Sequence, residues 1–389
     1  MDSLHMALTF LLAAAGISLA AAYVRVPYTI ALVVVGLALG HWHLGPSVTV
    51  TPEALFLALI VPLLFDGGLH LPLRDLRTYA GLIGSLAVIG TVLAAVVIGG
   101  AALFIWHLPV RTALLLGAIA SAIDPVSVIA LVREAALDRR LGTILEAEAV
   151  FNDGVAIVLF SVASAPHLPG LGSAVWQFIW LLGGGAVAGG LVALGVSLGL
   201  SRIREPLVEL LGSLVLAIAA FLAADAIGGS GVIAVVAAGI VLGNCAPRVL
   251  STTGQETLRT VWEVITYLAN SALFLVIGMA ILWQPLIDLA GVIAVVVLAA
   301  FAARAAGVYG LATICGRFLT PIPRAWQHVL VWGGLRGGVA IALVLALPRS
   351  LPGRDTVTAA VYGLVVFTLL AQGLTTRPLL RRFGLPEAL

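Results

Sequence analysis

Apolar runs long enough to cross a lipid bilayer recur from one end of this sequence to the other. A transmembrane helix needs about 20 mainly apolar residues to cross a hydrocarbon core of about 30 Å. We place such runs at about 6–24, 28–44, 52–71, 79–106, 111–133, 141–163, 173–200, 207–226, 229–246, 258–283, 286–313, 326–348 and 356–379. The composition agrees, because 61% of the residues are hydrophobic, 10% are charged and the mean hydropathy is +1.17. The sequence therefore predicts an all-α polytopic membrane protein with about thirteen transmembrane helices.

The basic residues sort by side of the membrane when these spans are connected in order. All twenty are arginine, and fifteen fall on one face, namely Arg25, Arg74, Arg77, Arg133, Arg139, Arg140, Arg202, Arg204, Arg248, Arg259, Arg317, Arg324, Arg377, Arg381 and Arg382. The opposite face has only Arg111, Arg349 and Arg354. Because cytoplasmic loops carry the excess of basic residues, we expect a multi-pass protein of the cell (inner) membrane with its N-terminus outside and its C-terminus in the cytoplasm.

Composition also excludes several kinds of chemistry. With no lysine, the chain cannot form a Walker A phosphate loop or a Schiff base with a cofactor. Cys245 and Cys315 lack metal-site spacing, so we expect neither a disulfide nor a zinc site. No connecting loop is long enough for a soluble domain, so residues 1–389 are expected to form one transmembrane domain that carries the function itself. We expect no cofactor, no nucleic-acid partner and no enzymatic activity.

The fifth span contains an aspartate followed by proline near its middle, in the sequence SAIDPVSVIAL. Pro125 has no N–H to donate to the Ser121 carbonyl, and it disfavours helical torsions at Asp124. An unwound backbone at membrane depth is tolerated only in a protein interior or at a water-filled cavity. A carboxylate beside free carbonyls is a site for a hard cation, although a proline kink in a packing helix is the alternative interpretation.

The sixth span, EAEAVFNDGVAIVLF at 146–160, carries three carboxylates and an amide. Asn152 and Asp153 lie at its midpoint, at the depth expected for the break in the fifth span. Glu146 shares a helix face with Asp153, whereas Glu148 shares another face with Asn152. We expect one face to meet that break and the other to meet a buried partner. The intramembrane Arg304 of the eleventh span is the candidate, because ionisable groups in lipid are costly unless paired.

The twelfth span contains WGGLRGGVAIAL, in which four glycines flank Arg336. Each glycine weakens a helix by about 1 kcal/mol, so this span is a second candidate for an interrupted helix. Close helix packing through small residues is the alternative. The fifth and twelfth spans hold corresponding places in two sets of six helices. We therefore predict two inverted six-helix repeats whose discontinuous helices cross near the midplane.

Seven blocks of sequence, in order along nearly the whole chain, resemble the cation:proton antiporters, specifically the NhaP-type branch of the sodium/proton exchangers. They are VPLLFDGGLHL, SAIDPVSVIAL, EAVFNDGVAIVLF, SGVIAVVAAGIVLG, WEVITYLANSALFLVIGM, ARAAGVYGL and WGGLRGGVA. The resemblance implies that Asp124 and Asp153 bind the ion and that Glu148 pairs with Arg304. It also places an acid of the first block, here Asp66, close to the ion path.

This sequence departs from its relatives at three of those positions. Ile123 stands where relatives often have threonine, and Ala149 where they have a hydroxyl residue, so two oxygen ligands are missing. The backbone at Ser121 and Ile123 then has a larger part in the expected ion site. Asp66 stands where many bacterial relatives have the longer glutamate. The choice among sodium, lithium and potassium is therefore left open by the sequence.

The resemblance implies secondary active antiport of a monovalent cation, sodium or lithium, against a proton, in the service of pH homeostasis. Asn152 in place of a second aspartate favours electroneutral exchange, with Asp153 as the residue that alternates between proton and cation. The implied motion is elevator-like, with a core bundle at about 79–163 and 286–379 sliding against a scaffold at about 1–71 and 173–283. A homodimer is also implied. For Arg336 we expect a place at the carboxyl end of a half-helix, where its charge is stabilising.

Other functions fit the sequence less well. An intramembrane aspartyl protease also needs two membrane aspartates, but its Gly-x-Gly-Asp signature is absent, and GGSGV at 228–232 lacks serine-hydrolase spacing. A passive cation channel would conduct without proton coupling. Potassium/proton exchange is the main alternative within transporters.

Overall fold

The computed structural model describes residues 16, 28–41, 56–125, 127–128, 138–165, 167–280, 283–318 and 320–382. Every element in these ranges is helical. Seven of the described helices are long and apolar enough to cross a membrane, and three shorter apolar helices accompany them. Only Gly16 of the first expected span, 6–24, is among the described residues.

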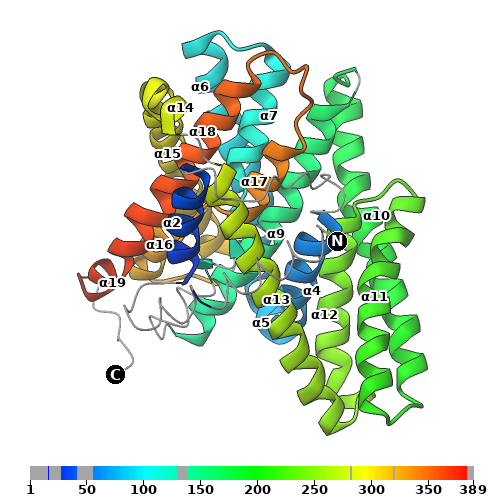
Figure 1. The fold of residues 1–389 in the computed structure, drawn as a ribbon. Coiled ribbons are helices and arrows are strands. Elements are labelled where there is room, and N and C mark those ends of the chain that lie inside the picture. Colours follow the sequence, from blue (N-terminus) through cyan, green and yellow to red (C-terminus); the bar gives the residue numbers. More distant parts are fainter. Residues whose placement is uncertain are drawn as a thin grey trace, which may run out of the picture.

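The described helices follow one another in the order shown in Figure 1. The first part of the chain forms α2 (Tyr28–His41), η1 (Phe56–Ile60), α4 (Val61–His70), α5 (Leu73–Ser85), η2 (Leu86–Gly90), α6 (Thr91–Trp106), α7 (Val110–Ser121) and α9 (Arg139–Ser164). The second part forms α10 (Leu171–Leu200), α11 (Pro206–Ala226), α12 (Gly231–Val249), α13 (Thr252–Ala280), α14 (Trp283–Asp288), α15 (Ala290–Phe318), α16 (Arg324–Trp332), α17 (Gly338–Leu345), α18 (Arg354–Phe367), η3 (Thr368–Gln372) and α19 (Gly373–Arg382).

Two groups of helices pack among themselves. Helices α2, α4, α10, α11, α12 and α13 form one group, in which α10, α11 and α12 lie side by side. The other group contains α6, α7, α9, α15 and α18. Glycines bring the backbones of the first group close together: a Cβ on Gly36 of α2 would lie 2.5 Å from the Leu275 carbonyl oxygen of α13. Small residues at such crossings are typical of packing between membrane helices.

The fourth span begins earlier than its hydropathy suggests. We expected it at 79–106, but α5, η2 and α6 run on from one another over residues 73–106. The apolar run stops on its N-terminal side at three charged residues, Arg74, Asp75 and Arg77. These residues nevertheless lie in the first two turns of α5, which starts directly after Pro72. Asp75 meets Arg139 there at 3.3 Å, and charged side chains near the end of a membrane helix can reach the membrane surface.

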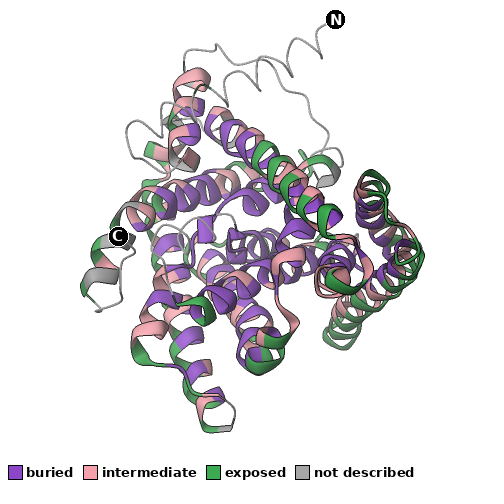
Figure 2. Cartoon of the chain, turned by 90° about the horizontal axis from the view of Figure 1, so that it is seen from below, coloured by how far each residue is buried: buried purple, intermediate pink, exposed green. Residues whose placement is uncertain are grey.

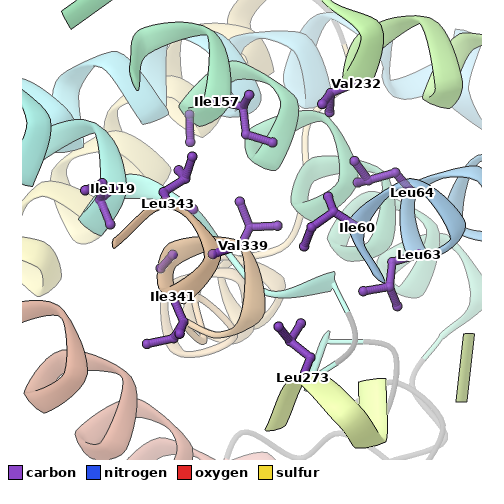
Figure 3. Close-up of a cluster of buried hydrophobic side chains, with 14 of the residues drawn as sticks. Ile60, Leu63, Leu64, Ile119, Ile157, Val232, Leu273, Val339, Ile341 and Leu343 are labelled. Atoms are coloured by element: carbon purple, nitrogen blue, oxygen red, sulfur yellow. The ribbon is translucent and has the colours of Figure 1, made fainter. Parts of the chain in front are cut away.

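The helices of the fifth span (α7) and of the twelfth span (α16 and α17), which the structure interrupts, meet at the centre of the molecule among apolar side chains. Around α17, the side chains of Val339, Ile341 and Leu343 lie among those of α4, α7, α9, α12 and α13 (Figure 3). Figure 2 shows that buried residues fill the middle of the bundle and that exposed residues lie along its outer helices. The polar groups described below are thus enclosed by protein rather than by lipid.

Candidate functional site

The fifth span is interrupted at the aspartate that precedes proline. Helix α7 ends at Ser121, and Ala122 follows in an extended conformation, with ψ of 136°. The Asp124 N–H leaves the helical pattern and donates to the Leu335 carbonyl oxygen, at 2.8 Å. Leu335 belongs to the non-helical segment 333–337 between α16 and α17. The two interrupted spans therefore meet through their unwound backbones.

Arg336 occupies the carboxyl end of α7. Its guanidinium donates to the Ser121 carbonyl oxygen and, at 2.8 Å, to that of Ala122. The carbonyl that loses its helical partner to Pro125 thus accepts from a cationic side chain. Arg336 is 3% exposed, and its own N–H donates to the Thr368 hydroxyl oxygen at 3.2 Å. A cation at a helix carboxyl end is stabilising because the macrodipole is negative there.

Arg304 occupies the corresponding place on the other interrupted span. Its guanidinium donates to the Leu330 carbonyl oxygen in the last turn of α16, at 2.7 and 3.1 Å. The same guanidinium forms a two-pronged ion pair with the Glu148 carboxylate of α9. Glu148 is 1% exposed, so each partner compensates the buried charge of the other.

The Asp124 carboxylate lies beside two helix starts, the helical turn at Ser127 and the first residues of α17. Its Oδ2 accepts from the Ser127 N–H at 2.9 Å and from the Ser127 hydroxyl. Gly337, the residue before α17, is in contact with the same carboxylate, since a Cβ at that glycine would lie 2.5 Å from the Asp124 Cγ. Negative charge is favourable at both positions because N–H groups there lack helical partners.

Asn152 holds α9 against the break in the fifth span. Its Oδ1 accepts from the Ile123 N–H at 2.6 Å, and its Nδ2 donates to the Thr91 hydroxyl oxygen. Asp153 follows directly and is 0% exposed. Within the described part of the chain, neither Asp153 carboxylate oxygen has a hydrogen-bond partner. A buried carboxylate in that state is costly unless a proton or a cation joins it.

A cavity of about 860 Å³ opens on the arginine-rich side of the bundle. His70 and Glu146 line it, together with Arg139 and residues of α12 and α13. The His70 Nδ1 is 2.9 Å from the Asp66 carbonyl oxygen and 3.3 Å from its Oδ1. Asp66 is 8% exposed and lies one helical turn from His70, away from the residues that line the cavity.

Sequence reasoning missed the residues that support the site. Four polar side chains form hydrogen bonds with Asn152 or with residues at the two interruptions. They are Thr91, Ser127, Thr368 and Gln372. Ser127 carried a local signal, because Asp124 is a favoured helix N-cap residue and such a side chain accepts from the N–H two or three residues on. Thr91 and Thr368 are hydroxyl residues within apolar spans, and no local pattern distinguishes them from the other hydroxyl residues there.

Comparison with known proteins gives one consistent match. The family model described as the transmembrane sodium/hydrogen exchanger matches residues 7–382. The Na⁺/H⁺ antiporter ApNhaP of Aphanothece halophytica is 39% identical over 368 residues, covering 93% of this chain and 70% of that protein. The Na⁺/H⁺ antiporter NhaH of Halobacillus dabanensis is 33% identical and covers 92% of both chains.

A solved structure matches over nearly the whole length. The sodium proton antiporter MjNhaP1 of Methanocaldococcus jannaschii superposes with a TM-score of 0.81, covering 98% of this chain and 99% of that one. The two sequences are 20% identical, so this likeness establishes the fold. The expected all-α architecture with interrupted, crossing helices is confirmed.

Proposed function

Because the chain belongs to the transmembrane sodium/hydrogen exchanger family, we propose that it exchanges Na⁺, with Li⁺ as a second accepted ion, for H⁺. The observation that carries this proposal is Asp153, a fully buried carboxylate with no protein partner among the described residues. Such a group binds a proton or a cation in turn, and competition between the two converts binding into exchange.

The neighbours of Asp153 have distinct parts in this proposal. Asp124 is the co-ligand, held by Ser127 at the start of a helix. Asn152 is neutral, and its bonds to Ile123 and Thr91 fix the spacing between α9 and the fifth-span break. Ser121 and Ile123 contribute backbone rather than side chains. The Ser121 carbonyl oxygen already accepts a hydrogen bond from the Arg336 guanidinium. Direct coordination of the transported cation by Ser121 therefore stays a prediction.

The motion that we propose is elevator-like. The core bundle is assigned to about 79–163 and 286–379 and the scaffold to about 1–71 and 173–283. The contact of Gly154 in α9 with Ile233 in α12 crosses the proposed boundary between them. Glycine at such a contact leaves no side chain of its own to obstruct sliding. We place the cavity containing His70 and Glu146 on the cytoplasmic side, as the ion entrance.

The chain is a multi-pass membrane protein of a transporter family. We propose that it lies in the inner membrane as a homodimer, with its N-terminus outside and C-terminus in the cytoplasm. The exchange is one cation per proton, because Asn152 leaves a single unpaired acid at the crossing.

Proteoliposomes with an acidic interior test these statements together. External Na⁺ or Li⁺ should dissipate the pH gradient, and an imposed voltage should leave the rate unchanged. The Asp153→Asn variant should be silent, whereas Asp225→Asn, an exposed aspartate on α11, should match the wild type. If only K⁺ dissipated the pH gradient, the protein would be a potassium/proton exchanger instead. A conductance without proton movement, or an active Asp153→Asn, would contradict antiport at this site.

A further inference from the structure

A second, apolar groove lies on the outside of the bundle, away from the polar site. It has a volume of about 460 Å³ and is bordered by α5, α9, α10 and α12. Phe151 and Val155 of α9 line it together with Ile233 and Ile240 of α12. The groove thus follows the boundary between the two groups of helices.

Small side chains keep this groove open. Ala80 and Gly84 on α5 face Ala186 on α10, and all three are exposed. A Cβ on Gly84 would meet no atom within 4 Å. These residues lie in helices that are long and apolar enough to cross a membrane. The opening therefore faces hydrocarbon, and the surrounding lipid can enter it.

The charge at one end of the groove indicates which lipid. Arg77 lies near that end, one helical turn from Leu73, which also lines the groove. It is exposed, and no carboxylate of the described residues forms a salt bridge with it. Along the helix, Arg77 and Val88 are about 16 Å apart at 1.5 Å per residue. That is about half of a hydrocarbon core of about 30 Å. The groove therefore matches one leaflet, with a cation at headgroup depth.

We propose that this groove binds an anionic phospholipid of the arginine-rich leaflet, with an acyl chain against Phe151 and Ile233 and the phosphate at Arg77. A membrane-embedded polypeptide is the other class of occupant. The lipid is favoured because Arg77, which carries the only charge among the described lining residues, lies at headgroup depth, and the apolar lining from Arg77 inward is about as long as one leaflet. The occupant touches α5 and α9 on one side and α10 and α12 on the other, so it links both groups of helices.

Native mass spectrometry of the delipidated full-length protein tests the proposal, with phosphatidylglycerol and phosphatidylcholine added in parallel. Arg77→Ala should weaken phosphatidylglycerol binding about fivefold, since a basic residue near the membrane surface contributes about 1 kcal/mol. Phosphatidylcholine binding should change less. Arg74→Ala is the control, because Arg74 is exposed on the same helix but does not line the groove. Equal lipid binding by these two variants would overturn the headgroup assignment.

A second pair of variants tests the groove itself. Gly84→Phe should fill it and reduce the binding of both lipids, whereas Gly100→Phe should not, although a Cβ at either glycine meets no atom within 4 Å. A photo-reactive residue in place of Ala186 should cross-link to a lipid in membranes. An adduct with the mass of a polypeptide, or lipid retention by Gly84→Phe equal to that of Gly100→Phe, would refute the proposal. Should Gly84→Phe fail to fold, the comparison of Arg77→Ala with Arg74→Ala still decides.

Discussion

Replacing Arg304 by glutamine should destabilise the protein more than any single loss of a surface charge. The variant leaves the Glu148 carboxylate, 1% exposed, without its ion-pair partner and the Leu330 carbonyl oxygen with weakened donors. Breaking a buried pair by removing one partner costs about 3 to 5 kcal/mol. The weakened carbonyl contact adds about 1 kcal/mol. We therefore expect a loss of about 4 to 6 kcal/mol, which is a large fraction of a typical total stability of 5–15 kcal/mol.

A double-mutant cycle separates the pair from the helix cap. Glu148→Gln combined with Arg304→Gln removes both charges, so most of the loss should be recovered and only the weakened contact with Leu330 should remain. Charge reversal, Glu148→Arg with Arg304→Glu, should not restore stability. A glutamate at position 304 cannot donate to Leu330, and its charge opposes the negative end of α16.

Unfolding of the purified protein by titration with sodium dodecyl sulfate measures these differences. Arg259→Gln is the matched control, because Arg259 is exposed and its pair with Glu263, at 3.7 Å, is a surface contact. The reasoning fails if Arg304→Gln costs no more than Arg259→Gln. It also fails if the charge-reversed protein is as stable as the wild type, since Leu330 would then need no donor.

Three further substitutions test the ion site. Gly337→Ala should abolish sodium-driven proton movement in folded protein, because its Cβ would lie 2.5 Å from the Asp124 Cγ; Gly310→Ala, with no atom within 4 Å of its Cβ, should be silent. An active Gly337→Ala would show that the contact with Asp124 is dispensable. Thr91→Val removes the hydroxyl that accepts from the Asn152 amide, a loss of about 1 kcal/mol that should weaken the apparent cation affinity about fivefold. An unchanged affinity would show that the position of Asn152 does not affect cation binding. Asn152→Asp should make the transport rate respond to an imposed voltage, and a rate that ignores voltage would contradict the charge argument.

The two helix interruptions could be predicted because their causes are local. Pro125 removes a donor and restricts Asp124, and glycines on both sides of Arg336 weaken the twelfth span. The structure accordingly ends α7 at Ser121 and leaves residues 333–337 out of helix. Spacing along α9 also separated two polar faces, and the Glu148 face meets Arg304.

The contacts that complete the site could not be predicted in the same way, because they join residues far apart in the chain. Asn152 and Thr91 are 61 residues apart, and Arg336 and Ser121 are 215 residues apart. A hydroxyl in an apolar span bonds equally well to its own helix, so its partner depends on how the helices pack. Hydropathy likewise missed the start of α5, because an apolar run ends where charge begins and not where backbone bonding ends.

The distribution of charge at the crossing supports the proposed exchange of one monovalent cation for one proton, in which no net charge crosses the membrane per cycle. The Asp124 carboxylate is balanced by the Ser127 N–H and the start of α17, and Arg336 by the carboxyl end of α7. Arg304 is neutralised by Glu148 while it caps α16. Among the described residues, Asp153 alone of these groups has no hydrogen-bond partner for its carboxylate, and its neighbour Asn152 is neutral. One uncompensated negative charge is satisfied by one proton or by one monovalent cation, and in either case the loaded site has the same net charge. With the proposed stoichiometry, the membrane voltage would do equal and opposite work on the two halves of the cycle, so it would not drive exchange in either direction.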